Sequence, residues 1–283
     1  MSCAWQAYLK LLPEWLRETV DKQGRDTLQE LRLRIGLPPK LLMGNRSITL
    51  EKKVNPNDIS FVINAVTQYS PWTSATIAKG YLTGEGGHRI GICGDAILDK
   101  DGNISSIRSA SSLNIRVARD FPGIAADIKH FNESIIIIGK PGWGKTTLLR
   151  DYIRQKSELT SEVVCVVDER REIFPIHKGQ ACFSTGKNTD ILSGCSKAQG
   201  IDALLRSMNP DTIAVDEITA EEDCSALLQA GWCGVKLVAT AHAGSKQDLF
   251  QRPIYRPIIE SGIFDSLIIL YADKSWHMER IRI

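Results

Sequence analysis

The sequence predicts an α/β protein in which a smaller α+β domain precedes a domain built on a parallel β-sheet. Residues 126–283 alternate short, uniformly apolar segments with helical segments, which is typical of parallel strands buried on both faces. Residues 1–125 mix helical segments with strands of alternating polarity. The length of 283 residues suits two domains of roughly 150 residues each. We therefore expect domains at residues 1–125 and 126–283, joined near Phe121-Pro122-Gly123.

The first half is expected to open with helices and to continue with short strands. Apolar residues share one helical face over residues 5–20, and Pro13 marks a kink or a new first turn. Residues 28–35 alternate apolar and charged side chains, which predicts a strand, and residues 56–69 have helical spacing. Further strands are expected at residues 40–43, 47–50, 81–83, 89–93 and 113–118.

The second half alternates predicted strands and helices. The strands are expected at Ile135–Ile138, Val163–Val167, Ile213–Val215, Leu237–Thr240 and Leu267–Leu270. The helices are expected at Thr146–Gln155, Ile201–Ser207, Glu221–Gln229 and Lys246–Gln251. Ligands of open parallel sheets bind at the carboxyl ends of the strands, so the chemistry is expected there.

Bulk composition excludes several classes of protein. The net charge of +2 gives no case for a general nucleic-acid or membrane surface. The chain has no apolar run of about 18 residues that would span a membrane, and its N-terminus lacks the basic start of a signal peptide. The seven cysteines are odd in number and form no C-x-x-C pair, which favours a reducing cytoplasm. We expect a cytoplasmic protein that does not bind nucleic acid.

The first strand of the second half runs into a phosphate-binding loop. Residues 139–146 match G-x-x-x-x-G-K-[ST] between a β-branched strand and a helix. Glycines let backbone N–H groups form an anion nest, which the start of the following helix reinforces. Lys145 is expected to reach the β- and γ-phosphates, and Thr146 to hold Mg²⁺. A glycine-rich turn with a solvated lysine is the alternative. The expected nucleotide-binding residues are Gly139, Lys140, Pro141, Gly142, Trp143, Gly144, Lys145, Thr146 and Thr147.

A pair of acidic residues ends another predicted strand. Asp216 and Glu217 directly follow Ile213–Val215, as in a Walker B element. Asp216 is expected to hold Mg²⁺, and Glu217 to polarise the attacking water. Such a pair is also common at helix caps, but downstream of a phosphate loop it predicts a hydrolytic site.

A second acidic run follows Val163–Val167. The functional interpretation places Glu169 or Glu172 near the γ-phosphate or its metal, and Arg170 or Arg171 at a neighbouring subunit. The other interpretation is a solvated helix cap with ion pairs of small energetic effect. The local pattern favours neither.

His242 and Arg206 complete the set of candidate catalytic residues. His242 follows the strand Leu237–Thr240, where a histidine can sense the γ-phosphate or position water, although a lone histidine is more often structural. Arg206 lies just before the Walker B strand. Its guanidinium can reach phosphate in its own site or across an interface, or it is a surface helix arginine.

Taken in order, these segments resemble the Walker A, Asp box, Walker B and His box of the type II, type IV and pilus-motor secretion ATPases. The match is closer still to the stage III sporulation protein AA family, from about residue 28 to about residue 243. The segments that carry it are ELRLR at 30–34, GGHRIG at 86–91, SSLNIR at 111–116, GKPGWGKTT at 139–147, VDER at 167–170, TDIL at 189–192, RSM at 206–208, VDEI at 215–218 and TAH at 240–242.

The resemblance implies a RecA/AAA+-like P-loop ATPase that uses ATP and Mg²⁺ and forms a homo-oligomeric, hexameric ring. It implies a cytoplasmic protein, peripheral at a membrane complex, that drives a secretion-like channel between mother cell and forespore. Membrane-embedded components of that channel are the expected partners. Arg89 and Arg116 are expected to close over the phosphates from the same or the next subunit, by arginine-finger logic.

Departures from the family pattern keep two alternatives open. Thr219 and Ala220 stand where the family usually has glycine and a basic residue, and Ala243 displaces the glycine after the His box. One alternative is a nucleotide-gated scaffold with negligible turnover, motivated by Thr219 and Ala220. The other is a nucleic-acid motor of RecA type, since the sheet alone is shared, which the near-neutral charge disfavours.

Overall fold

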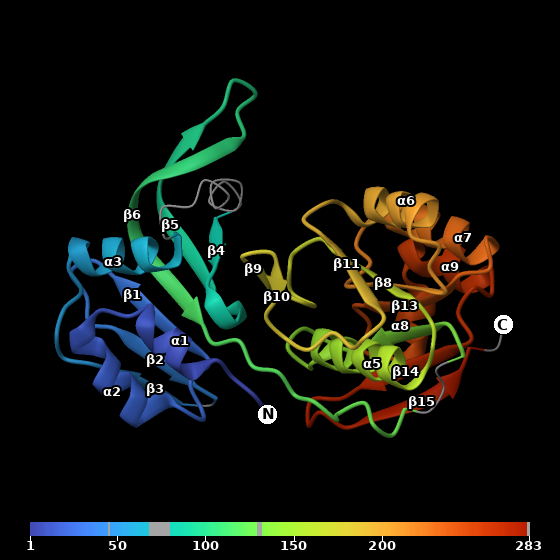
Figure 1. Ribbon diagram of the computed structural model, residues 1–283, viewed down its shortest axis with the longest axis horizontal. Coiled ribbons are helices and arrows are strands. Elements are labelled where there is room, and N and C mark those ends of the chain that lie inside the picture. The colour runs from blue at the N-terminus through green and yellow to red at the C-terminus, as the bar shows by residue number, and fades with distance from the viewer. Residues whose placement is uncertain (45, 68–79, 129–131, 282–283) are drawn as a thin grey trace. The chain divides into compact units, whose positions relative to one another are not determined.

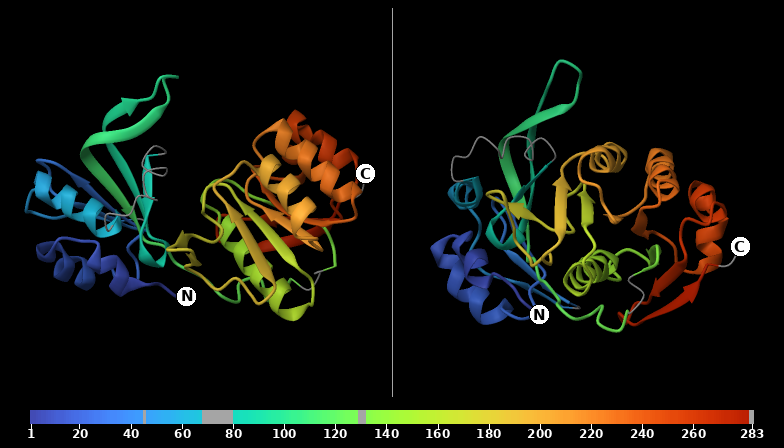
Figure 2. Two further views of the ribbon diagram at one scale, coloured as in Figure 1. Left: turned by 45° about the horizontal axis from the view of Figure 1, so that its top comes forward. Right: turned by 45° about the vertical axis from the view of Figure 1, so that its right-hand side comes forward.

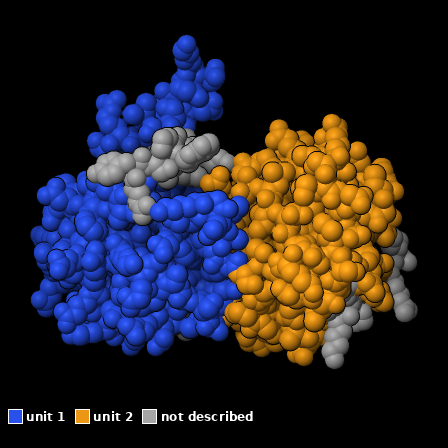
Figure 3. All heavy atoms as spheres, viewed as in Figure 1, with its two compact units in different colours: residues 1–120, 175–183 blue, residues 121–174, 184–283 orange. Residues whose placement is uncertain are grey.

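The computed structural model describes residues 1–44, 46–67, 80–128 and 132–281. The chain separates into two compact units (Figure 3). Unit 1 contains residues 1–120 and 175–183, and unit 2 contains residues 121–174 and 184–283. Each unit has its own sheet and its own hydrophobic core. Within the described residues, no helix combines the length and the apolarity that a membrane crossing requires.

Unit 1 is built on a six-stranded antiparallel sheet with the order β3-β2-β1-β6-β5-β4 (Figure 1). Alternate residues of its strands, such as Leu31 and Leu33, are buried against Tyr8, Leu12 and Leu16 of the N-terminal segment. The predicted break at Pro13 is confirmed, because one helix ends before it and a second begins after it. The elements are α1 (Trp5–Lys10), α2 (Glu14–Gly24), β1 (Glu30–Arg34), β2 (Lys40–Met43), β3 (Arg46–Thr49), α3 (Pro56–Thr67), β4 (Tyr81–Thr83), η2 (Glu85–Gly87), β5 (Arg89–Leu98), β6 (Ile104–Arg116), β9 (Ile176–His177) and β10 (Gln180–Ala181).

Two strands predicted for the first half, at residues 89–93 and 113–118, are longer in the structure. Strands β5 and β6 continue beyond the sheet as a long hairpin arm (Figure 1). The prediction missed this arm because its residues are mostly exposed on both faces, and a strand without a buried face has no apolar alternation. The helix predicted over residues 56–69 is α3, and residues 68 and 69 lie outside the described part of the chain.

His88 anchors the N-terminal segment of unit 1. Its Nε2 lies 3.0 Å from the carbonyl oxygen of Ala4, and its Nδ1 accepts a hydrogen bond from the backbone N–H of Ala118 at 3.0 Å. Because Nδ1 accepts, the proton of the neutral ring is on Nε2, which donates to Ala4. Burial lowers the pKa of His88 to about 4, so the ring stays neutral near pH 7.

Unit 2 is built on a seven-stranded sheet with the order β11-β8-β12-β13-β7-β14-β15. All neighbouring strands are parallel except β14 and β15, which are antiparallel. The central strands are fully buried, as their uniformly apolar sequences predicted. The strands are β7 (Ile135–Ile138), β8 (Val164–Asp168), β11 (Thr189–Ser193), β12 (Thr212–Val215), β13 (Lys236–Ala241), β14 (Ser266–Leu270) and β15 (Trp276–Arg280).

Helices cover both faces of this sheet (Figures 1 and 2). Helix α5 (Lys145–Leu159) lies on one face, and α6 (Lys197–Ser207), α7 (Glu221–Trp232) and α9 (Arg256–Glu260) lie on the other. Residues of α6, α7 and α9 share one apolar cluster with alternate residues of the strands. The short helix α8 (Lys246–Gln251) has the predicted bounds. The predicted fold class is confirmed: a parallel-sheet α/β unit follows a smaller unit with an antiparallel sheet.

Candidate functional site

The loop between β7 and α5 has the backbone of an anion-binding nest. Gly142 and Gly144 have φ angles of +78° and +103°, which L-residues with side chains rarely adopt. A Cβ atom at either glycine would meet nothing within 4 Å. Glycine is therefore required at these positions by the positive φ and not by a lack of space, and the space above the loop is open. Gly144 is the N-cap residue of α5, and no side chain accepts a hydrogen bond at this cap. The first N–H groups of the helix are thus available to an anion such as phosphate.

Lys145 folds back over this loop and is largely buried. Its Nζ donates to the carbonyl oxygen of Gly139 at 2.8 Å and lies 2.9 Å from Nδ1 of His242. Burial lowers the pKa of Lys145 from its ordinary value, while Glu217 and Asp216 act in the opposite direction. The ammonium group is therefore held by the loop at the edge where the strands end.

Asp216 receives hydrogen bonds from two threonines. Thr146 Oγ1 donates to Asp216 Oδ2 at 2.9 Å, and Thr240 Oγ1 donates to Asp216 Oδ1 at 2.7 Å. The hydroxyl and the carboxylate predicted to hold Mg²⁺ therefore lie together, and hard oxygen ligands of this kind suit that ion. Thr240 is buried and also accepts from the backbone N–H of Glu217 at 2.9 Å. Thr240 was not among the predicted site residues, although it stands two residues before the predicted His242.

His242 joins the phosphate-loop lysine to the predicted base. Its Nε2 lies 2.8 Å from Oε1 of Glu217, while its Nδ1 faces Nζ of Lys145. An ammonium group only donates, so Nδ1 is the acceptor and the ring proton is on Nε2, directed at the carboxylate. The three side chains form one hydrogen-bonded chain, Lys145–His242–Glu217. Such a chain can keep a carboxylate oriented beside a bound phosphate.

The acidic run after β8 divides into a structural and an exposed part. Asp168 is buried, and its carboxylate accepts hydrogen bonds from the backbone N–H groups of Glu172 and Phe174 at 2.8 and 2.9 Å. Burial raises the pKa of Asp168, while these hydrogen bonds lower it. Glu169 instead pairs with Lys197, whose Nζ lies 2.6 Å from Oε2 of Glu169.

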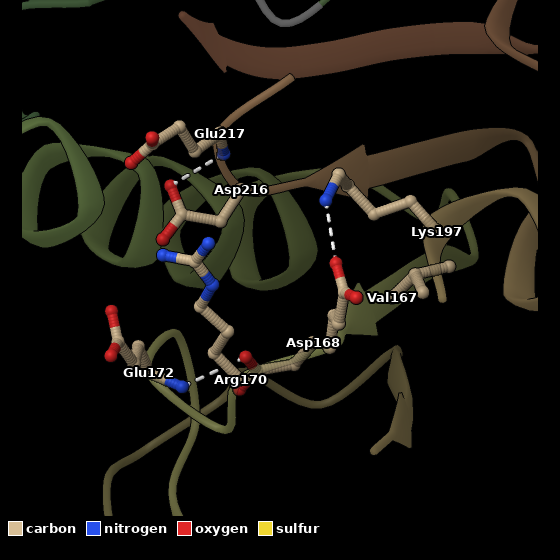
Figure 4. Close-up of a pocket in the computed structure, with 8 residues that line it drawn as sticks. Val167, Asp168, Arg170, Glu172, Lys197, Asp216 and Glu217 are labelled. Atoms are coloured by element: carbon tan, nitrogen blue, oxygen red, sulfur yellow. Dashed lines mark hydrogen bonds and ion pairs between the residues drawn. The ribbon is translucent and has the colours of Figure 1, made fainter. Parts of the chain in front are cut away.

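A narrow, mostly acidic pocket lies between the ends of β8 and β12 (Figure 4). The guanidinium of Arg170 extends into it toward the carboxylate of Asp216, and Glu217 lies beyond (Figure 4). The pocket joins Glu169 and Asp216 in one site, as their positions at strand ends predicted. Its lining residues are Val167, Asp168, Glu169, Arg170, Glu172, Lys197, Asp216 and Glu217.

The other predicted arginines lie on α6 and in unit 1. Arg206 is exposed in the last turn of α6 and pairs with Asp202 at 2.9 Å. This turn leads into the amino end of β12, so it lies at the sheet edge opposite the phosphate loop, and the structure does not bring Arg206 to the loop of its own chain. Arg89 and Arg116 belong to unit 1, where they are opposite each other on β5 and β6.

Lys274 is a loop contact that sequence analysis missed. Its Nζ donates to the carbonyl oxygen of Gly142 at 2.6 Å. It lies in the turn between β14 and β15 with a φ of +71°, and the side chain of Asp273 fixes this turn through Ser275. No local pattern marks Lys274, because its position depends on β14 pairing beside β7.

Comparison with known proteins identifies a family whose model matches most of the chain. The model of a family described as "Sporulation stage III, protein AA" matches residues 6–280. Stage III sporulation protein AA of Bacillus subtilis (strain 168) is 34% identical over 278 residues, 94% of this chain and 90% of the relative.

Solved structures share the fold. The ATPase DotB of Legionella pneumophila has a TM-score of 0.61 at 18% identity, covering 95% of this chain and 80% of that one. The pilus retraction motor PilT, solved with bound ADP, has a TM-score of 0.63 at 16% identity, covering 90% and 76%. These likenesses confirm the predicted fold class, in which a P-loop-like α/β unit with a mostly parallel sheet follows a unit with an antiparallel sheet.

Proposed function

The chain belongs to the stage III sporulation protein AA family, and we propose that it is a Mg²⁺-dependent ATPase that drives a sporulation secretion-like channel between mother cell and forespore. One observation carries the enzymatic part of this proposal. The hydrogen-bonded chain Lys145–His242–Glu217 connects the phosphate loop to a carboxylate at the strand end. The similarity in fold to a structure called an ATPase, and to one called a motor and solved with ADP, supports ATP as the substrate.

Each residue of the site has a separate role in this proposal. The backbone N–H groups of residues 139–147, Pro141 excepted, would hold the phosphates, and Lys145 would turn from His242 toward them. Thr146 and Asp216 would hold Mg²⁺, which when bound would offset the charge of the phosphate oxygens. Glu217 orients the attacking water, because His242 already fixes its carboxylate. Glu169 is the second candidate for this task, and its pairing with Lys197 makes it the less available one.

The assembly part of the proposal rests on the family. We expect a hexameric ring, cytoplasmic and peripheral at a membrane complex, whose partners are membrane-embedded channel components. Arg206 can act only across an interface, given its place on α6. Arg89 and Arg116, in the proposed domain 1–125, are the candidates that close over the phosphates of the domain 126–283.

Paired variants of the loop lysine and the base test the enzymatic part. Lys145→Ala is expected to lose both binding of a fluorescent ADP analogue and Mg-ATP hydrolysis. Glu217→Gln is expected to keep the binding and to lose turnover by about 10²-fold or more. Lys246→Ala, which replaces a half-buried lysine at the start of α8 whose Nζ donates to the carbonyl oxygen of Arg280, is the matched control and should change neither. Hydrolysis that persists undiminished in Lys145→Ala would refute the assignment of the site.

A scaffold with negligible turnover is the second candidate function. The backbone N–H groups of Thr219 and Ala220 are both bound to Asp223, and the site has no basic side chain at position 220. The scaffold predicts analogue binding in the wild type without Glu217-dependent turnover at any protein concentration. Turnover that rises with protein concentration and requires Glu217 excludes it.

A further inference from the structure

Lys197 is a buried lysine that lies between two carboxylates beside the proposed site. Its side chain is 7% exposed, and its Nζ lies 2.6 Å from Oε2 of Glu169 and 3.3 Å from Oδ2 of Asp223. A buried ammonium group is unfavourable unless it is paired, and here two partners come from two different elements. Lys197 is the first residue of α6, so three segments meet at its charge.

Asp223 extends this contact to the loop that carries Glu217. It is a residue of the first turn of α7, and its Oδ2 accepts from the backbone N–H groups of Thr219 and Ala220 at 3.0 and 3.2 Å. These two residues follow Glu217 with only Ile218 between. The path Glu169–Lys197–Asp223 therefore joins the loop after β8 to the loop after β12.

The surrounding charges make the lysine necessary for this arrangement. The pocket beside it is lined by the carboxylates of Asp168, Glu169, Glu172, Asp216 and Glu217 (Figure 4). Without Lys197, Glu169 and Asp223 would lie close together as like charges, and such pairs repel. Glu169, the more exposed of the two, would move, and the loop after β12 would lose its support.

We propose that Lys197 is a positioning residue for ATP hydrolysis, which fixes the loop of Glu217 relative to Glu169 through Asp223. The inference rests on the proposed function. Lys197 is hydrogen-bonded to neither the phosphate loop nor Asp216. Its removal should therefore lower kcat without weakening nucleotide binding, since the binding residues keep their own contacts.

Lys197→Met and Lys197→Arg in the full-length chain test this proposal. Methionine keeps the volume of the side chain and removes the charge, and a misplaced catalytic group costs up to about 10²-fold in rate. We expect kcat to fall at least about tenfold in Lys197→Met, with the Kd of a fluorescent ADP analogue changed less than about twofold. Arginine should restore part of kcat. An unchanged kcat, or a parallel loss of affinity, overturns the proposal.

A matched lysine separates positioning from stability. Lys236 also forms a lysine–carboxylate pair, with Glu162 at 2.5 Å, and it begins β13 at the opposite end from the site. Lys236→Met should lower the thermal midpoint and leave kcat as in the wild type. If Lys236→Met lowers kcat as much as Lys197→Met at a temperature where both are folded, the effect is general instability and the proposal fails.

Hydrogen exchange tests the inference without turnover. In Lys197→Met, the backbone N–H groups of residues 217–220 should exchange at least about tenfold faster than in the wild type. In Lys236→Met, the same N–H groups should exchange at the wild-type rate. Unchanged exchange refutes the positioning role even if the enzyme is active. Conversely, a wild type without hydrolysis refutes the proposed function, while faster exchange in the variant still establishes the link between the two loops.

Discussion

At the scale of single residues, His242 is hydrogen-bonded to two side chains of opposite charge. It accepts from the ammonium of Lys145 and donates to the carboxylate of Glu217, which requires a neutral ring with its proton on Nε2. A phosphate that draws Lys145 away would leave Nδ1 without its donor. A role for His242 was predictable from its position at the end of a strand. Its bond to Lys145 was not, because this contact joins residues far apart in the chain.

Replacing His242 by alanine should separate binding from turnover. Glu217 would lose the hydrogen bond that orients it, so we expect kcat to fall about 10²-fold, the order that a positioned acid–base group contributes. Lys145 retains Gly139 as a partner, so the affinity for an ADP analogue should change little. Steady-state turnover and a fluorescence titration measure the two quantities. Equal losses in both would indicate that His242 only supports the loop.

His88 makes the stability of unit 1 depend on pH. Its folded pKa of about 4 lies below the ordinary 6.5, so the unfolded chain binds more protons between these values. The stabilisation is therefore complete above pH 6.5 and is lost as the pH falls through about 4. At 1.36 kcal/mol for each pKa unit, the loss is at most about 3 kcal/mol. The hydrogen bond to the backbone of Ala4 opposes burial and raises the pKa of His88, as Glu85 does, while Arg119 lowers it.

Thermal unfolding of the wild type and of His88→Gln across this pH range tests the assignment. Glutamine removes the titrating ring, so the variant should be less stable at pH 7 and should lose less stability between pH 6.5 and 4. Carboxylates elsewhere titrate equally in both proteins, so the difference between the two curves isolates His88. Parallel curves would show that the ring does not control this transition.

At the scale of elements, the strands of unit 2 that are buried on both faces were predictable, and the edge strands of that sheet were not. Every residue of strands β7, β8, β12, β13 and β14 is buried except Lys236 at the start of β13, and their apolar runs identify them. The edge strands β11 and β15 are only partly buried and contain polar residues, so no periodicity separates them from loops. This is also why the turn before β15, and the contact of Lys274 with the phosphate loop, went unpredicted.

Lys274→Ala should weaken nucleotide binding through this turn. The lysine adds a positive charge beside the phosphate loop and holds the carbonyl oxygen of Gly142. A hydrogen bond of this kind contributes about 1 kcal/mol, so the Kd for ADP should rise about three- to tenfold. The effect should shrink at high ionic strength, because exposed charges are screened. Lys246→Ala is the matched control. Titrations at low and high salt measure the difference, and an unchanged Kd at low salt would contradict it.

At the scale of the whole molecule, the family was predictable because its motifs are separated along most of the chain. Each motif alone could be explained by an ordinary structural feature, such as a glycine-rich turn or a helix cap. The full set of motifs in this order could not be explained in that way. The match over residues 6–280 confirms that prediction. The sequence left open whether Arg206 acts in its own site or across an interface. The structure places it in the turn that leads into the amino end of β12, at the sheet edge opposite its own phosphate loop.

Arg206 provides the test of assembly. It lies at the sheet edge opposite its own phosphate loop, and its exposed pair with Asp202 adds little stability. If a neighbouring subunit uses it, Arg206→Ala should stay folded and lose about 10³-fold in turnover, as arginine fingers supplied in trans do. Asp202→Asn removes the charged partner of Arg206, and this variant should keep its turnover. If turnover is unchanged in Arg206→Ala, Arg206 is a surface arginine without a role in hydrolysis.

A mixture of two inactive variants decides whether the arginine acts between chains. Lys145→Ala lacks a working phosphate loop but keeps Arg206, and Arg206→Ala has the reverse defect. In a mixed ring, a subunit with an intact loop can receive the arginine of its neighbour, so turnover should reappear on mixing and increase with total protein concentration. Arg206 acting within its own chain would leave the mixture as inactive as its parts. The recovery therefore requires both an assembly and an active site shared across its interface.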